Sequence, residues 1–155
     1  MPQITPFLWF DKEAEEAANY YVSVFPNSKL GAVARYGPGQ PGPEGSVMTI
    51  AFELDGKPFV GLNGGPIFKF TEAVSFSISC ETQADIDHYW DKLSDGGQPG
   101  PCGWLKDRWG LSWQVVPAIL PQLLKGGGER AGRVMGVVMQ SGKLDIAALQ
   151  AAYDG

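Results

Sequence analysis

Residues 106–117 read Lys-Asp-Arg-Trp-Gly-Leu-Ser-Trp-Gln-Val-Val-Pro, and they carry the clearest signal of the fold. Asp107 to Gly110 is typical of a turn, because glycine adopts a positive φ without strain. After the turn, large apolar residues alternate with smaller or polar ones, namely Leu111, Trp113 and Val115 against Ser112, Gln114 and Val116. This alternation predicts a half-buried strand whose apolar side packs on a helix. Its polar side is left for water or a ligand.

The composition describes an ordinary globular chain of 155 residues, 44% of them hydrophobic, with a net charge of −5. The 12 basic residues are scattered, which argues against a nucleic-acid surface. No apolar run approaches the roughly 20 residues of a membrane span, and there is no signal-peptide pattern. We therefore expect a cytoplasmic protein that contacts neither nucleic acid nor membrane, with Cys80 and Cys102 as thiols.

The first half of the chain predicts a module of strand, helix and three strands. The expected elements are the strand Gln3–Phe10, the helix Lys12–Phe25 with Asp11 as N-cap, the strand Lys29–Tyr36, and the hairpin strands Val47–Leu54 and Lys57–Asn63. Asp55-Gly56 is a strong signal for the two-residue hairpin turn. The Gly/Pro-rich segment 37–45 is expected to be an exposed, mobile loop.

Each hairpin strand has two distinct faces. We expect one face to hold Met48, Ile50, Phe52, Leu54, Val60 and Leu62, and the other to hold Thr49, Ala51, Glu53, Phe59, Gly61 and Asn63. On the first strand, Phe7 and Trp9 share the second of these faces with Thr5, opposite Ile4, Leu8 and Phe10.

About 70 positions later the same order starts again. We expect a strand from Val74 to Cys80, a helix opened by Thr82 and ending at Ser94, and a hairpin of residues 103–107 and 111–116. We expect the strand between that helix and hairpin to be degenerate, because Gln98–Cys102 is rich in Pro and Gly. Three helices follow, at residues 118–124, 129–140 and 146–153, the last capped by Asp145.

The predicted fold is α+β: two βαβββ modules at residues 1–65 and 66–117, and a helical extension at 118–155, together one compact domain. Such paired modules resemble the vicinal oxygen chelate superfamily of glyoxalases, extradiol dioxygenases and bleomycin-resistance proteins. Five strings resemble its PhnB-like branch, whose members carry the name demethylubiquinone methyltransferase. They are Ile-Thr-Pro-Phe-Leu-Trp-Phe-Asp (4–11), Tyr-Tyr-Val-Ser-Val-Phe-Pro-Asn-Ser (20–28), Leu-Asn-Gly-Gly-Pro (62–66), Cys-Gly-Trp-Leu-Lys-Asp-Arg-Trp-Gly-Leu-Ser-Trp-Gln (102–114) and Leu-Asp-Ile-Ala-Ala-Leu (144–149).

Enzymes of this superfamily bind a divalent metal through His and Glu residues on four strands that line a cup. The resemblance places these positions near Thr5, Gly61, Ser75 and Gln114. Hydroxyl and amide groups are poor ligands for a transition metal. The single histidine, His88, lies outside the apolar stripe of its predicted helix, so we expect it to be solvated. We therefore expect no metal and no cofactor.

The cup face nonetheless collects aromatic and polar groups that suit a small-molecule pocket. The candidate ligand-binding residues are Thr5, Phe7, Trp9, Glu53, Asn63, Ser75, Ser77, Ser112 and Gln114. The same groups also suit a polar sheet face that is filled by side chains or by a second subunit. Three serines on one strand are a poor choice for a closed interior, which favours the ligand pocket.

The residues leave three functions open. The leading one is metal-free binding of a small molecule. The second is an enzyme of the same fold, a lyase, isomerase or methyltransferase that uses Glu53, Gln114 or a cofactor delivered with the substrate. A Gly-rich strand-to-helix turn for S-adenosylmethionine is absent from the sequence, and Cys102 is a further, less favoured reactive group. The third is a structural homodimer with a vestigial cup.

A homodimer is also expected for the first two functions. The resemblance implies pairing between subunits. The degenerate second module also leaves a strand edge incompletely covered, and exposed edges must be paired or blocked. The apolar tail residues Val134, Met135, Val137, Val138, Leu144, Ile146 and Leu149 offer more apolar surface than one small domain readily buries.

Overall fold

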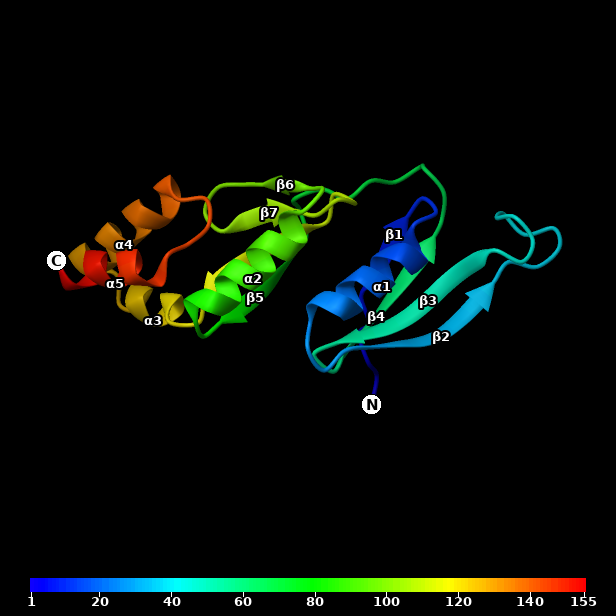
Figure 1. Ribbon diagram of the computed structural model, residues 1–155, viewed down its shortest axis with the longest axis horizontal. Coiled ribbons are helices and arrows are strands. Elements are labelled where there is room, and N and C mark those ends of the chain that lie inside the picture. The colour runs from blue at the N-terminus through cyan, green and yellow to red at the C-terminus, as the bar shows by residue number, and fades with distance from the viewer. The chain divides into compact units, whose positions relative to one another are not determined.

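The computed structural model describes all residues, 1–155, and the chain folds into two compact units, Met1–Phe70 and Thr71–Gly155 (Figure 1). Each unit holds a four-stranded sheet with a helix packed on it. The α+β fold of two βαβββ modules is therefore confirmed. No helix in the chain has the length and apolar character needed to cross a bilayer.

The first unit contains β1 (Phe7–Phe10), α1 (Ala14–Val24), β2 (Lys29–Arg35), β3 (Val47–Leu54) and β4 (Lys57–Asn63). The strand order in this first sheet is β1-β4-β3-β2, and only the β1–β4 pair is parallel. Both turn residues between β3 and β4, Asp55 and Gly56, have positive φ, as the predicted turn requires. Helix α1 buries an alanine-rich stripe with Tyr21 and Val24, which lets it lie close to β3 and β4.

The predicted start of this unit is wrong in two details. Strand β1 begins at Phe7 rather than Gln3, after Pro6, which has no N–H for the ladder. Helix α1 begins at Ala14, and Asp11 does not cap it. The Asn63 side chain instead accepts a hydrogen bond from the Ala14 N–H at 2.8 Å.

The second unit contains β5 (Ser75–Cys80), α2 (Gln83–Ser94), β6 (Gln98–Pro99), β7 (Trp104–Lys106) and β8 (Ser112–Pro117). The strand order in this second sheet is β5-β8-β7-β6, with β5 and β8 parallel. Strand β6 has only two residues, which confirms that the strand before the hairpin is degenerate. The Thr82 hydroxyl accepts a hydrogen bond from the Asp85 N–H at 3.1 Å, so the predicted helix start is confirmed as well.

Trp113 lies in the core of the second unit, as its alternation predicts. Only 3% of its surface is exposed, and its ring lies 5.7 Å from that of Phe76 on the neighbouring strand. Its indole N–H donates to the buried Asp107 carboxylate at 2.9 Å. The same carboxylate accepts the N–H groups of Trp109 and Leu111, so one side chain fixes both the turn and the strand that follows.

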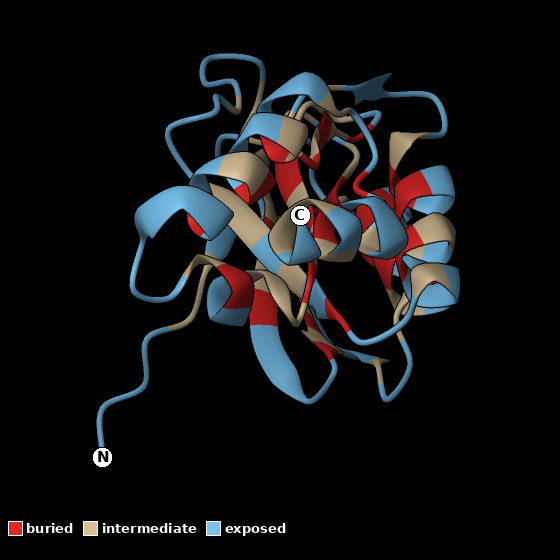
Figure 2. Ribbon diagram, turned by 90° about the vertical axis from the view of Figure 1, so that its left-hand side faces the viewer, coloured by how far each residue is buried: buried red, intermediate tan, exposed pale blue.

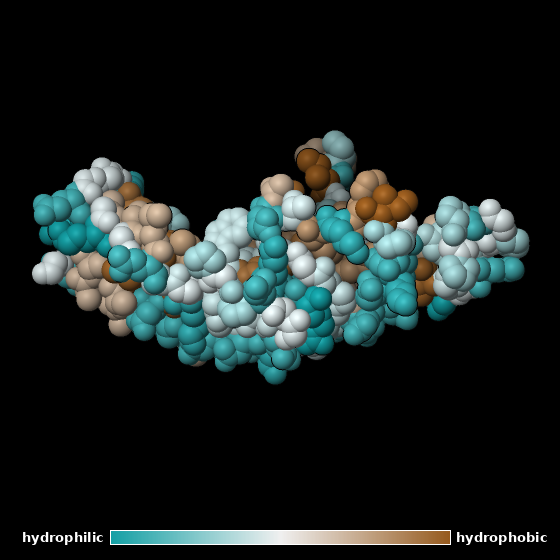
Figure 3. Space-filling view, turned by 90° about the horizontal axis from the view of Figure 1, so that it is seen from above, coloured by the Kyte–Doolittle hydropathy of each residue, from teal (hydrophilic) through white to brown (hydrophobic).

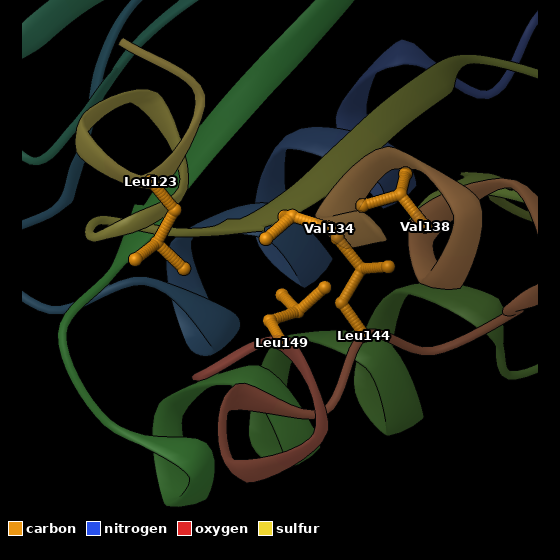
Figure 4. Close-up of a cluster of buried hydrophobic side chains, with 5 residues drawn as sticks. All are labelled: Leu123, Val134, Val138, Leu144 and Leu149. Atoms are coloured by element: carbon orange, nitrogen blue, oxygen red, sulfur yellow. The ribbon is translucent and has the colours of Figure 1, made fainter. Parts of the chain in front are cut away.

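The helical tail comprises α3 (Leu120–Leu124), α4 (Gly128–Gln140) and α5 (Ile146–Asp154). Figure 4 shows five of its side chains pointing toward one another: Leu123, Val134, Val138, Leu144 and Leu149, all buried. Gln83 of α2 ties this tail to the second sheet's module, donating to the Leu144 carbonyl and accepting from the Ile146 N–H. The tail thus buries most of its apolar residues itself, contrary to the expectation of a large surplus.

Buried residues recur at intervals along the helices and along most strands, which is the pattern of elements with one covered face (Figure 2), whereas β2 is exposed throughout. Hydrophobic side chains also remain at the surface among the hydrophilic ones (Figure 3). The large exposed ones are Met1, Ile4, Phe7, Leu30, Val33, Ile67 and Phe68 in the first unit, and Val74, Met135 and Met139 in the second.

Candidate functional site

The polar candidates of the second unit lie in two rows across the face of its sheet that is opposite to Trp113. The β7–β8 and β8–β5 registers align Lys106, Ser112 and Ser75 in one row, and Trp104, Gln114 and Ser77 in the next. Residues aligned in this way project to the same side of a sheet. The structure therefore brings Ser75, Ser77, Ser112 and Gln114 together and adds Trp104 and Lys106, which the sequence reasoning missed.

Two of these side chains are hydrogen-bonded to each other, and a third has no hydrogen-bond partner. The Gln114 amide donates to the Ser75 hydroxyl at 2.9 Å. The Ser112 side chain is 1% exposed, and its hydroxyl has no hydrogen-bond partner. A buried polar group without a partner costs about 1–3 kcal/mol. Ser112 is thus a costly residue for the folded chain alone, at a place where alanine would fit.

Ser112 lies at a cavity of about 330 Å³ in the second unit. The cavity is also lined by the Pro/Gly segment 98–101, by Trp104 and by the ion pair between the Lys106 ammonium and the Glu72 carboxylate. The hydrogen bond from Lys106 holds the pKa of Glu72 below its usual range, so this carboxylate is charged at neutral pH. The cavity therefore combines an aromatic wall, a buried hydroxyl and a paired lysine.

The candidates of the first unit lie apart from this cavity along the chain, on the first sheet. The β1–β4 register aligns Phe7 with Val60 and Trp9 with Leu62, on the face away from α1. The Trp9 indole donates to the Gly65 carbonyl at 2.9 Å and meets the Phe68 ring edge-to-face at 4.9 Å. Thr5 lies before β1 begins.

Glu53 is a surface residue of this sheet. Its carboxylate pairs with the Lys29 ammonium of β2 at 3.2 Å, and both side chains are partly exposed. This is a solvated arrangement rather than the dry pocket in which a carboxylate acts as a general base.

The predicted faces of β4 are wrong. The register pairs Phe52 with Phe59 and Ile50 with Gly61, so Phe59, Gly61 and Asn63 lie on the side that α1 covers. A Cβ atom on Gly61 would lie 3.2 Å from the Cβ of Ala14. The two-residue turn already dictated this result, because it places Lys57 opposite Leu54. Asn63 consequently caps α1 and donates to the Val47 carbonyl instead of facing the open side of the sheet.

The four positions expected for a metal do not fit one. Gly61 faces α1, and Thr5 lies outside the strands. Ser75 and Gln114 are hydrogen-bonded to each other. No group of three or more His, Cys, Asp and Glu residues lies close enough to hold an ion. His88 is exposed on α2, where its ring contacts Tyr89, as its position outside the apolar stripe predicts.

A larger cavity, about 560 Å³, lies in the first unit at the start of α1. Asp11, Lys12, Glu15 and Arg35 contribute two charges of each sign, and residues 41–43 of the Gly/Pro-rich loop lie over Tyr36. The Tyr36 hydroxyl donates to the Asn63 carbonyl, and Arg35 donates to the Gly45 carbonyl. No buried polar side chain here lacks a partner. The cavity at Ser112 is therefore the stronger candidate.

The comparisons with known proteins agree with this architecture. The family model for 3-demethylubiquinone-9 3-methyltransferase matches residues 2–116, so the string at 144–149 lies outside it. The chain is 36% identical to the PhnB protein from Bacillus cereus, with a TM-score of 0.68 over 76% of this chain and 100% of that one. A Pseudomonas aeruginosa protein shares 20% identity, with a TM-score of 0.62 over 76% of this chain and 98% of that one.

The fosfomycin resistance protein FosX from Mesorhizobium loti shows the same fold at 13% identity, with a TM-score of 0.53 over 74% of this chain and 90% of that one. A comparison with curated protein sequences found no match. The chain belongs to the 3-demethylubiquinone-9 3-methyltransferase-like (PhnB) family and has the glyoxalase/bleomycin-resistance fold.

Proposed function

We propose that the chain binds a small organic molecule on the open face of the second sheet, through its side chains and without a metal ion. The observation that carries this proposal is the Ser112 hydroxyl, which is buried, unpartnered and at a cavity. Buried polar groups in folded proteins nearly always have a partner, and an exception calls for an explanation. A ligand group that bonds to Ser112 supplies that explanation.

The neighbourhood of Ser112 supports the proposal. A volume of about 330 Å³ is at the lower end of the range for small-molecule pockets. Trp104 offers a flat apolar surface, while Gln114 and Ser75 hold each other in place beside it. Polar groups that are fixed before binding lose little conformational entropy when a ligand arrives.

The name of the matched family favours methyl transfer as a second candidate function. The three strand-to-helix connections, residues 11–13, 81–82 and 118–119, contain no glycine, and the first two carry acidic residues. Backbone N–H groups at a Gly-rich turn are what a nucleotide-type cofactor uses, so these connections fit S-adenosylmethionine poorly. Calorimetric titration with S-adenosylmethionine separates the two candidates, and the binding proposal expects no heat of association.

The test of the proposed function compares two serine variants on the same sheet face. A library of small organic fragments is screened by ligand-observed NMR against the wild type, Ser112→Ala and Ser79→Ala. We expect to find fragments that bind both the wild type and Ser79→Ala. The affinity of these fragments for Ser112→Ala should be lower by about fivefold or more, since a buried hydrogen bond is lost. Fragments that bind all three chains equally, or none of them, would overturn the proposal.

A further inference from the structure

We infer that the molecule bound at Ser112 carries a carboxylate, which takes the place of the Glu72 carboxylate beside Lys106. This inference rests on the proposed function and names the class of its ligand, an aromatic carboxylate. None of Glu72, Trp104 and Lys106 was a candidate from the sequence. The site lies entirely within residues 72–112 of the second unit.

Two hydrogen-bond donors lie side by side at the cavity. Lys106 of β7 and Ser112 of β8 face each other in the antiparallel register. Cβ atoms of such a pair are about 5 Å apart, so an ammonium and a hydroxyl can reach the two oxygens of one carboxylate. Charge-assisted hydrogen bonds of this kind are the stronger ones, and they would satisfy the Ser112 hydroxyl.

A carboxylate of the chain itself already lies beside Lys106. Glu72 pairs with Lys106 at the rim of the same cavity, and their side chains are 60% and 40% exposed. Ion pairs this exposed hold together weakly and exchange readily. A ligand carboxylate that replaces Glu72 leaves Lys106 paired, and it gains the Ser112 hydroxyl as an additional partner.

The cavity also offers an apolar surface for the body of the ligand. Trp104 lies in the next row from Lys106 and Ser112, two residues along β7, and it lines the cavity together with Pro99 and Pro101. Aromatic rings stack on indole and proline surfaces in this way. The cavity volume of about 330 Å³ suits a ligand of one or two rings.

The test uses benzoate and its neutral analogue benzamide as probes. Each is titrated into the ¹⁵N-labelled chain, and the indole N–H signal of Trp104, assigned through Trp104→Phe, reports binding. The variants are Glu72→Gln, which removes the internal carboxylate, and Lys106→Met, which removes the ammonium but keeps the length of the side chain. Glu129→Gln is the matched control, since it changes the same group in an exposed ion pair on α4. The dispersion of each spectrum reports that the variant is folded.

We expect benzoate to shift the Trp104 signal and benzamide to leave it in place. Glu72→Gln should tighten benzoate binding about fivefold, because the competing carboxylate is gone. Lys106→Met should weaken it about tenfold or more, and Glu129→Gln should leave it unchanged.

Two results would overturn the inference. Equal shifts with benzamide and benzoate would show small-molecule binding without a carboxylate subsite, so the proposed function would stand. Benzoate binding that Glu72→Gln fails to tighten, or no benzoate shift in any variant, would remove the carboxylate as the recognised group. The comparison of Ser112→Ala with Ser79→Ala then decides the proposed function separately.

Discussion

At the scale of single residues, one carboxylate organises the stretch that defines the second unit. Asp107 is buried and accepts hydrogen bonds from two backbone N–H groups and from the Trp113 indole. The sequence indicated a turn at this place but not a buried acid, because aspartate in a turn is usually exposed. The alternation did predict the direction of Trp113 correctly. Successive side chains of a strand point to opposite faces, so the apolar residues at every second position mark the buried face.

Trp113 and Trp9 should differ in their contribution to stability. Trp113→Ala should lower the free energy of unfolding by about 3–5 kcal/mol, the cost of a large core truncation. Trp9 is only half-buried, so Trp9→Ala should cost much less. Urea denaturation of both variants measures the two losses. A larger loss for Trp9→Ala would contradict the packing of Trp113 against Phe76.

Cys80 should make the stability depend on pH at the alkaline end. Burial, with a smaller contribution from Asp85, raises the pKa of its thiol to about 11. The unfolded chain therefore loses this proton at lower pH than the folded chain, from about pH 8.5 upward. Stability is retained below that pH and declines toward pH 11. Urea melts should show a steeper decline for the wild type than for Cys80→Ala, and parallel curves would contradict this.

At the scale of elements, the sequence predicted most helices and strands but misassigned the faces of β4. Strands β3 and β4 and the start of α2 follow from local signals: alternation, the Asp55-Gly56 turn and the Thr82 cap. The cap of α1 could not be predicted from local sequence, because it comes from Asn63, 49 positions away. Part of the candidate site was out of reach for the same reason. Glu72 pairs with Lys106 from 34 positions away.

Asn63 should therefore act on the stability of α1. Asn63→Ala removes the cap of Ala14 and the hydrogen bond to Val47, so we expect a loss of about 1–2 kcal/mol. The Tyr36 bond goes to the main-chain carbonyl and is retained. Asn19→Ala, an exposed substitution on the same helix, is the control and should stay within about 0.5 kcal/mol. If thermal melts show equal effects, Asn63 does not cap the helix.

At the scale of the whole molecule, we propose that the chain forms a homodimer. The tail covers most of its apolar residues, but Met135 and Met139 on α4 stay 38% and 68% exposed. Gly132 and Gly136 of the same helix have open space around them. Phe7, Ile67 and Phe68 are further exposed apolar side chains in the first unit. A two-fold interface of more than about 1,000 Å² would cover such residues in both copies.

Sedimentation equilibrium at micromolar concentration tests this proposal. We expect a species of twice the chain mass, and Met139→Glu should weaken its association if α4 contributes to the interface. A single species of 16.7 kDa across the concentration range would refute the dimer.

The central claim is that the chain holds a small organic molecule without a metal ion. Native mass spectrometry of the chain purified from its host, joined to elemental analysis of the same sample, tests it most directly. We expect a folded species that carries an organic adduct of a few hundred daltons or less, released on activation, and less than about one tenth of an equivalent of Mn, Fe, Ni or Zn. About one equivalent of metal that survives dialysis, with no organic adduct, would contradict the account.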